Sequence, residues 1–300
     1  MKLNLRQIEV FRAVMLTGSV VGASKLLYVS QPAISRLIAH TEQRLGFELF
    51  LRTKGRLYPT PEARRLLSEV NVVYEGVERV NEVADDLASN RTGSLRISCS
   101  PNVAQTVLPR AIARFRTAHP AVRVVVRSQI PTNMLQALLS GQVDLAVSNM
   151  PIAHPNLTSQ LLAKNPIVAL IPEGHRLSTR AWVRPVELVG ENLIGYRENV
   201  PFGLLIHEMF ATLDEPPQMP MEVDQAQIAR AMAQVGAGIA LVDALTVFGE
   251  TTTGCVAVPI RTKVNASVQI FHLQTEALSR LAQEFVGMLT GVIELGHGGA

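Results

Sequence analysis

From residue 94 onward the sequence alternates Val- and Ile-rich runs with amphipathic segments, and this alternation restricts the possible folds more than any other feature. The runs SLRIS, VRVVVR and VDLAVS predict strands, and VAQTVLPRAIARFR and PTNMLQALLSG between them predict helices. Strands that are joined by helices lie parallel and are buried on both faces, which explains their apolar composition. The sequence therefore predicts an α/β fold built on a mostly parallel sheet.

A second alternating series follows a break at Pro151 and Pro155. Its expected strands are PIVALIPEG, NLIGY, MEVDQ, GIALVD, CVAVPI and VQIFHL, and its main helices are FGLLIHEMFATL and QAQIARAMAQVG. A final helix is expected near LSRLAQEFVGMLTGVI. Two α/β lobes imply a cleft, and ligands of open α/β sheets bind beyond the carboxyl ends of the strands.

Residues 5–45 have a helical pattern. Apolar periodicity over residues 5–27 predicts a helix and a short second helix. A third helix is expected to begin after Ser30, with Pro32 in its first turn, where a missing N–H costs nothing. Its free face carries Gln31, Ser35 and Arg36. This order of elements predicts a helix-turn-helix motif.

Residues 47–60 predict a small hairpin, and residues 61–88 predict one long helix. The hairpin, FELFLRTKGRLYPT, carries three cations around its turn, Arg52, Lys54 and Arg56. In the long helix, apolar residues recur about every 3.5 positions, the spacing of a helix paired with a second copy. Packing of the helix on its own domain is the alternative. The polar segment ASNRTGS at 88–94 is expected to be a hinge.

Charge is concentrated at the start of the chain. The net charge is only +3, but residues 1–65 hold eleven Lys and Arg against four Glu and no Asp. Clustered cations of this kind suit a polyanion such as nucleic acid, because they neutralise phosphates. A solvated basic face without a partner is the other interpretation of the same charges.

Several classes of protein are excluded by what the sequence lacks. The two cysteines, Cys99 and Cys255, rule out a disulfide scaffold and paired-Cys zinc sites, and they favour a reducing cytoplasm. Charged residues interrupt the N-terminal apolar run, so neither a signal peptide nor a membrane partner is expected. The motifs G-x-S-x-G, H-E-x-x-H and the phosphate loop are absent, and no cofactor or metal is predicted. An enzyme or a solute-binding protein built on the same two-lobed body remains the alternative.

Residues 11–63 resemble the N-terminal domain of LysR-type transcriptional regulators. The resemblance is carried by Gly18-Ser19, Val29-Ser30-Gln31-Pro32-Ala33-Ile34-Ser35-Arg36, Glu42, Leu45-Gly46, Leu49-Phe50, Arg52 and Pro59-Thr60. Val20-Val21 and Gly22 depart from the family pattern, but they lie away from the base-reading face. The resemblance continues through the long helix and both lobes.

The resemblance implies three regions. These are a winged helix-turn-helix DNA-binding domain at 1–60, a linker (dimerisation) helix at 61–90, and an effector-binding domain at 91–300 that is similar to periplasmic binding proteins. Lobe I of that domain is expected at about 91–162 and 267–300, and lobe II at about 163–266. Regulators of this type are cytoplasmic and are not enzymes. They bind double-stranded DNA, dimerise through the linker helix and usually form tetramers, and as activators they contact RNA polymerase.

A small effector bound between the lobes controls such regulators. The segments RQIEVFRAVMLTGS and TKGRLYPTPEARRLLSEV are most similar to regulators of lysine biosynthesis and of opine catabolism. The implied effector is therefore an amino acid or a derivative of one, such as lysine, diaminopimelate or an opine.

The expected DNA-binding residues lie on the third helix and the hairpin. Gln31, Ser35 and Arg36 have side chains that can read base edges, and Ser30, Pro32 and Ala33 begin the same helix. Arg52, Lys54 and Arg56 are expected to bind phosphates or reach a minor groove. Solvent-exposed charge without a partner is the alternative, above all for these three.

The expected effector-binding residues follow the ends of predicted strands. They are Ser100, Asn102, Ser128, Gln129, Ser148, Asn149, Tyr196, Arg197, Glu198 and Phe202. Arg197 could hold a carboxylate and Glu198 an ammonium group, although either could be a solvated loop charge. Asp224 and Thr246 are weaker candidates, and Asp144 is expected to orient its strand.

Overall fold

The computed structural model describes residues 3–53, 56–88, 93–198, 200–249 and 253–297. The chain forms two compact units, Met1–Leu87 and Ala88–Ala300, and each is described by itself. None of the helices in the described residues has the length and apolar character needed to cross a membrane.

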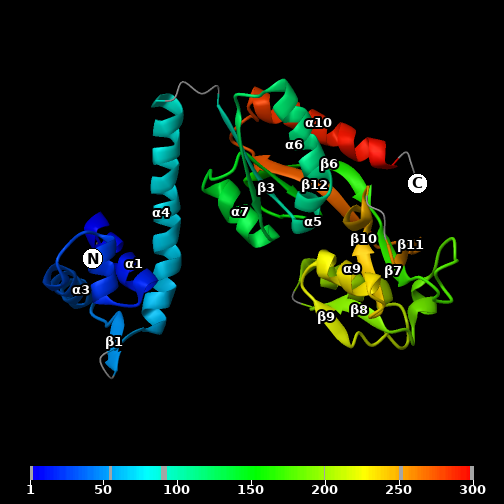
Figure 1. Ribbon diagram of the computed structural model, residues 1–300, viewed down its shortest axis with the longest axis horizontal. Coiled ribbons are helices and arrows are strands. Elements are labelled where there is room, and N and C mark those ends of the chain that lie inside the picture. Colours follow the sequence, from blue (N-terminus) through cyan, green and yellow to red (C-terminus); the bar gives the residue numbers. More distant parts are fainter. Residues whose placement is uncertain (1–2, 54–55, 89–92, 199, 250–252, 298–300) are drawn as a thin grey trace. The chain divides into compact units, whose positions relative to one another are not determined.

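The first unit consists of three helices, a hairpin and one long helix (Figure 1). Its elements are α1 (Leu5–Thr17), α2 (Val20–Leu26), α3 (Gln31–Leu45), β1 (Phe50–Thr53), β2 (Arg56–Pro59) and α4 (Pro61–Ala88). Strands β1 and β2 pair antiparallel. The core joins all three short helices to the start of α4, through residues such as Phe11, Ala23, Ile34 and Val70. The predicted helix-turn-helix with a wing is therefore present.

Local signals in the sequence set the ends of these helices. The Asn4 side chain accepts a hydrogen bond from the backbone N–H of Gln7, and the Ser19 hydroxyl accepts one from Gly22. Gly46 ends α3 in the left-handed conformation, at φ 79°, where L-residues with a side chain are strained. Ser30 takes the N-cap position of α3, but its side chain makes no capping bond.

The second unit contains two five-stranded sheets. The lobe I sheet has the order β4-β3-β5-β12-β6, formed by β3 (Ser94–Cys99), β4 (Arg123–Ser128), β5 (Leu145–Ser148), β6 (Leu157–Asn165) and β12 (Ala266–Leu273). The lobe II sheet has the order β11-β7-β10-β8-β9, formed by β7 (Ile167–Pro172), β8 (Leu193–Tyr196), β9 (Met221–Val223), β10 (Ile239–Asp243) and β11 (Cys255–Pro259). The predicted two-lobed α/β body is therefore confirmed.

Helices cover both sheets. Those of lobe I are α5 (Pro101–Gln105), α6 (Val107–Ala118), α7 (Pro131–Leu139) and α10 (Arg280–His297). Those of lobe II are α8 (Pro201–Phe210), α9 (Ala226–Gln234) and a short 3-10 turn, η1 (Pro185–Leu188). A second 3-10 turn, η2 (Ala244–Val247), follows β10 and contacts the cores of both lobes. In lobe I, α6 and α10 share one hydrophobic core and α7 contributes to a second, on the other face of the sheet. Figure 1 shows α6 and α10 next to each other.

The topology differs from the sequence prediction in three ways. The sheets are mixed, because β12 runs antiparallel to β5 and β6, and β7 runs antiparallel to β10 and β11. Strand β6 was not predicted; it lies at a sheet edge and is mostly exposed, so it lacks an apolar run. The helix predicted over residues 103–116 is two helices, because Thr106 leaves helical geometry at ψ −84°.

Both cysteines are buried and form no disulfide. Burial raises the pKa of the Cys99 thiol to about 12 and also raises the pKa of Cys255. Because the thiolate is the reactive form, we expect neither cysteine to react with Ellman's reagent in the folded protein at mildly alkaline pH. Both should react after unfolding in guanidinium chloride. A thiol that reacts rapidly in the native protein would contradict this burial.

Candidate functional site

Helix α3 presents one face to its own core and the opposite face to solvent. Ile34 is 1% exposed and Ile38 is 9% exposed, and both pack in the core of the first unit. The opposite side carries the residues predicted to bind DNA. Ser35 is half-buried there, and the others are exposed: Ser30, Gln31, Pro32, Ala33 and Arg36. An exposed helix N-terminus whose N–H groups point outward is suited to bind phosphate.

Arg36 is available to an external ligand. Its Nε donates a hydrogen bond to the carbonyl oxygen of Pro32, one turn earlier, over 3.4 Å. Among the residues that the structure describes, no acidic side chain pairs with it. The terminal nitrogens of its guanidinium group are therefore free to donate to an acceptor outside the chain.

The wing is tied to α3 by a half-buried carboxylate that the sequence did not single out as functional. Oε1 of Glu42 accepts hydrogen bonds from the backbone N–H groups of Leu49 (2.8 Å) and Phe50 (3.1 Å) at the start of β1. Lys54 lies outside the described residues, and so do the side chains of Arg52 and Arg56. The backbone pairs Arg52 with Leu57, and Thr53 with Arg56.

Replacing Glu42 with alanine should leave two N–H groups at the wing without an acceptor. We expect the free energy of unfolding of the first unit to fall by about 1–3 kcal/mol. Glu42→Gln keeps an oxygen at the same place and should lose much less. Denaturant unfolding of both variants tests this, and equal losses would show that the contact does not depend on the acceptor oxygen.

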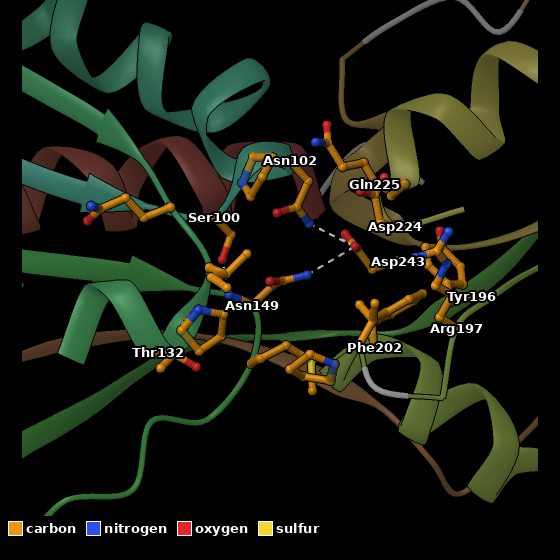
Figure 2. A pocket seen from close by; sticks show the side chains of 18 residues that line it. Ser100, Asn102, Thr132, Asn149, Tyr196, Arg197, Phe202, Asp224, Gln225 and Asp243 are labelled. Atoms are coloured by element: carbon orange, nitrogen blue, oxygen red, sulfur yellow. Dashed lines mark hydrogen bonds between the residues drawn. The ribbon is translucent and has the colours of Figure 1, made fainter. Parts of the chain in front are cut away.

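A cavity of about 460 Å³ lies within the second unit. It is lined by Ser100, Pro101, Asn102, Gln129, Ile130, Pro131, Thr132, Asn149, Met150, Tyr196, Arg197, Val200, Pro201, Phe202, Asp224, Gln225, Ala226 and Asp243. These residues follow strands β3, β4, β5, β8, β9 and β10, and they include the first residues of α5, α7, α8 and α9. Figure 2 shows side chains from both lobes facing this space. The carboxyl ends of strands and the N-termini of helices thus converge on one site, as they do in ligand-binding α/β proteins.

Seven of the ten predicted effector residues line this cavity: Ser100, Asn102, Gln129, Asn149, Tyr196, Arg197 and Phe202. Asp224, a weaker candidate, lines it as well. Ser128, Ser148, Glu198 and Thr246 do not.

Each of these absences has a local reason. Ser128 is exposed at the end of β4, and Glu198 is exposed in the loop after β8. Ser148 is fully buried, and its hydroxyl oxygen accepts a hydrogen bond from the backbone N–H of Met150 over 3.0 Å. Thr246 is also fully buried. The assignment of an ammonium site to Glu198 therefore has no support in the geometry.

Asp144 orients its strand, as expected. Its carboxylate accepts a hydrogen bond from the backbone N–H of Arg96 (2.7 Å) and pairs with the Arg96 guanidinium (2.6 Å). It thereby fixes the start of β5 against β3.

Two opposite charges lie side by side on the lobe II wall of the cavity. Tyr196 of β8 is paired with Val223 of β9 in a parallel register, so the residues that follow, Arg197 and Asp224, are neighbours. Both side chains are exposed, and neither forms an ion pair among the described residues. A ligand with a carboxylate and an ammonium group could satisfy both.

Asp243 is the most deeply buried charge in the cavity wall. Its carboxylate oxygens accept hydrogen bonds from the side-chain amides of Asn102 (2.7 Å), Asn165 (3.0 Å) and Asn149 (3.3 Å). Burial raises the pKa of this carboxyl, while the three amide hydrogen bonds lower it. Burial, together with the charge of Asp243, holds the pKa of the Tyr196 hydroxyl well above its usual value.

Several lining residues are not among those predicted from the sequence. Asp243 ends the apolar run GIALVD, so the same rule that selected Asn102 and Asn149, a polar residue at the carboxyl end of a strand, would have found it. Ile130, Thr132 and Gln225 lie at helix starts. These have no chemical signature of their own, and only the placement of the helices brings them to the cavity.

No group of three or more His, Cys, Asp or Glu side chains in the described part of the chain is arranged to hold a metal ion. The candidate sites are therefore an exposed helix face in the first unit and a charged cavity in the second.

Comparison with known proteins identifies both regions. Residues 5–64 match the model of the bacterial regulatory helix-turn-helix protein, lysR family, and residues 88–293 match the LysR substrate binding domain. The transcriptional activator protein LysR of Escherichia coli K12 is 32% identical over 95% of this chain and 92% of its own length. The octopine catabolism/uptake operon regulatory protein OccR of Rhizobium meliloti is 32% identical over 80% of both chains.

The fold is shared with a solved regulator. Full-length CbnR in complex with its target DNA superposes with a TM-score of 0.78 at 20% identity, over 97% of this chain and 100% of the other. The order of a helix-turn-helix, a long helix and a two-lobed body is the same in both. This chain belongs to the LysR family of DNA-binding transcriptional regulators.

Proposed function

We propose that α3 enters the major groove of the operator and reads it with the first turns of the helix. Gln31 would pair with adenine, Arg36 with the O6 and N7 atoms of guanine, and Ser35 with either. Ser30, Pro32 and Ala33 would contact the backbone or a thymine methyl group. The exposed N-terminal face of α3 supports this assignment. The wing cations Arg52, Lys54 and Arg56 would bind phosphate beside it or reach a minor groove.

We further propose that the protein dimerises through α4. The first part of α4 packs on the core of its own unit through Leu66, Leu67 and Val70. Farther along, four valines are exposed at helical spacing: Val72, Val73, Val77 and Val80. An exposed apolar stripe on a long helix suits pairing with a second copy.

Substituting aspartate for Val73, Val77 and Val80 together should abolish the dimer, because the charges would face each other in the paired helices. Sedimentation velocity at micromolar concentration should then show a monomer for the variant. The matched control replaces three exposed polar positions of α4, Glu62, Ser68 and Glu69, with alanine. An unchanged sedimentation coefficient in the valine variant would refute pairing along this stripe.

The activity proposed is activation of transcription in the cytoplasm. Dimers would join into tetramers on the promoter and contact RNA polymerase. The support is the resemblance of the whole chain to the activator LysR, at 32% identity.

The effector proposed for the cavity is an amino acid or an amino-acid derivative such as lysine, diaminopimelate or an opine. The observation that carries this is Arg197 beside Asp224 in the cavity wall, neither of which has an ionic partner among the described residues; the pair matches the carboxylate and ammonium of an amino acid. Asp224 takes the place that the sequence assigned to Glu198. The similarity to OccR, which is named for octopine catabolism, points to the same chemical class.

Titration calorimetry of the full-length protein with lysine, diaminopimelate, arginine and octopine tests this proposal. At least one should bind with a dissociation constant in the micromolar range, and the same compound should change the footprint on DNA. If none binds while a compound without an amino group does, the amino-acid assignment is wrong. Bound compound without any change in the DNA complex would contradict its role as effector.

A further inference from the structure

Asp243 forms a cross-lobe cluster with Asn102, Asn149 and Asn165. Asp243 ends β10 in the lobe II sheet. All three asparagines belong to lobe I: Asn102 is in α5, Asn149 follows β5, and Asn165 ends β6. Just after Asp243 the chain reaches the lobe I core before it returns to lobe II at β11, since Val242 packs in the lobe II core and Leu245 in the lobe I core. The cluster therefore lies where the two lobes join, and three of its four residues line the cavity.

The carboxylate of Asp243 is buried without a counter-charge. Its residue is 1% exposed, and its oxygens are held by neutral amides and by the backbone N–H of Thr246. Within the described ranges, no Lys, Arg or His side chain forms an ion pair with it. Neutral donors compensate a buried charge only in part, and such charges in proteins are normally paired with a cation. Asp243 therefore leaves a negative charge in the wall of the cavity.

The amides of the cluster are oriented by this carboxylate. An ionised carboxylate only accepts hydrogen bonds, so Asn102 and Asn149 turn their Nδ2 atoms toward Asp243. Figure 2 shows both nitrogens on the Asp243 side and both oxygens on the opposite side. The Asn102 oxygen accepts the backbone N–H of Val103 over 2.9 Å. The Asn149 oxygen has no donor among the described residues, and Asn149 lines the cavity.

A second polar group in the same wall also lacks a partner. The hydroxyl of Tyr196 is buried and makes no hydrogen bond in the described part of the structure. Its ring is held by an edge contact with Phe202, with ring centroids 4.9 Å apart. The cavity thus combines an uncompensated negative charge, a free carbonyl oxygen and a free tyrosine hydroxyl. A cationic nitrogen would complement the negative charge, and either oxygen could accept a hydrogen bond from it.

We propose that Asp243 makes the cavity selective for a ligand whose side chain ends in a cationic nitrogen, a guanidinium or an ammonium group. The cation donates to a free acceptor of this wall, the Asn149 oxygen or the Tyr196 hydroxyl oxygen, and Asp243 supplies the opposing charge while holding the Asn149 amide in the accepting orientation. Asp243 is therefore a positioning residue rather than a direct contact. The inference rests on the proposed effector cavity, and it narrows the effector to basic amino acids and their conjugates.

The test compares ligands that differ only in the cation. Arginine and citrulline have nearly the same shape, but citrulline carries a neutral ureido group in place of the guanidinium. In calorimetry of the full-length wild type, arginine should bind at least about tenfold more tightly than citrulline. Lysine and norleucine form a second matched pair, for an ammonium group. Equal affinities within both pairs would overturn the inference, and this comparison needs no variant.

Variants of the cluster distinguish an effect of the Asp243 charge on ligand affinity from a purely structural role of the cluster. Asp243→Asn removes the charge at nearly constant volume and should bring the arginine-to-citrulline ratio close to one. Asn165→Ala loosens the cluster on the side away from the cavity and should keep the ratio. If Asn165→Ala and Asp243→Asn weaken both ligands equally, the cluster is only structural.

A probe without an amino-acid head distinguishes this inference from the proposed function. Agmatine carries the guanidinium of arginine but no carboxylate. At millimolar concentration it should raise the melting temperature of the wild type and not that of Asp243→Asn. If agmatine discriminates in this way while no amino acid alters the DNA complex, the cation site stands and the effector proposal fails. If agmatine stabilises both proteins alike, or neither, the cation site is refuted.

Discussion

Replacing Arg36 with alanine is expected to weaken binding to the operator by about 5- to 150-fold, which corresponds to about 1–3 kcal/mol. The reason is the position of Arg36 on the exposed face of α3, where its guanidinium has no acidic partner among the described residues. Because the variant loses a bidentate contact with guanine, its preference for that base pair should also be weaker. Electrophoretic mobility shifts on the operator and on single-base variants measure both effects.

The matched control is Lys54→Ala in the wing. A phosphate contact carries no sequence information, so this variant should weaken binding to all duplexes alike. The slope of log affinity against log salt concentration should become shallower by about one. Unchanged operator affinity for Arg36→Ala would remove Arg36 from the base-reading set. A loss of affinity that is the same for every duplex would show instead that Arg36 contacts phosphate.

Replacing Arg197 with alanine is expected to lower the affinity for an amino-acid effector by about 10- to 100-fold. Arg197 lines the cavity without an ionic partner in the described residues, and a charge-assisted hydrogen bond to a carboxylate is worth about 1.5–3 kcal/mol. Calorimetry with the compound that binds the wild type measures the loss. Thermal unfolding should be nearly unchanged, because the side chain is exposed.

Glu198→Ala is the matched control, because Glu198 is the next residue, is also charged and exposed, and lies outside the cavity lining. Its affinity for the same compound should equal that of the wild type. If Glu198→Ala weakens binding as much as Arg197→Ala does, the loop as a whole matters and neither charge is a specific contact.

The sequence predicted the DNA-binding unit well because its signals are local. Apolar periodicity, the caps Ser19 and Thr60, and Gly46 at a left-handed position fix its helices within short stretches of chain. What could not be predicted is the link between Glu42 and the wing, since it depends on where the hairpin packs.

The cavity was predicted only in part, for a physical reason. Residues that follow buried strands could be identified, because strand ends share one edge of a sheet, and this found Ser100, Asn102 and Arg197. The cross-lobe cluster joins Asn102 to Asp243, which are 141 positions apart, and no local pattern reports such a contact. Exposed edge strand β6 was missed for the opposite reason, because burial gives strands their apolar signature.

The most direct test is a mobility-shift titration of full-length protein on the DNA upstream of its own gene, against a scrambled duplex of equal length, at two salt concentrations. We predict that the protein still prefers the upstream DNA at least about 100-fold at the higher salt, and that a basic amino acid changes the mobility or footprint of that complex alone. Equal affinity for both duplexes at moderate salt, with or without the amino acids, would contradict it.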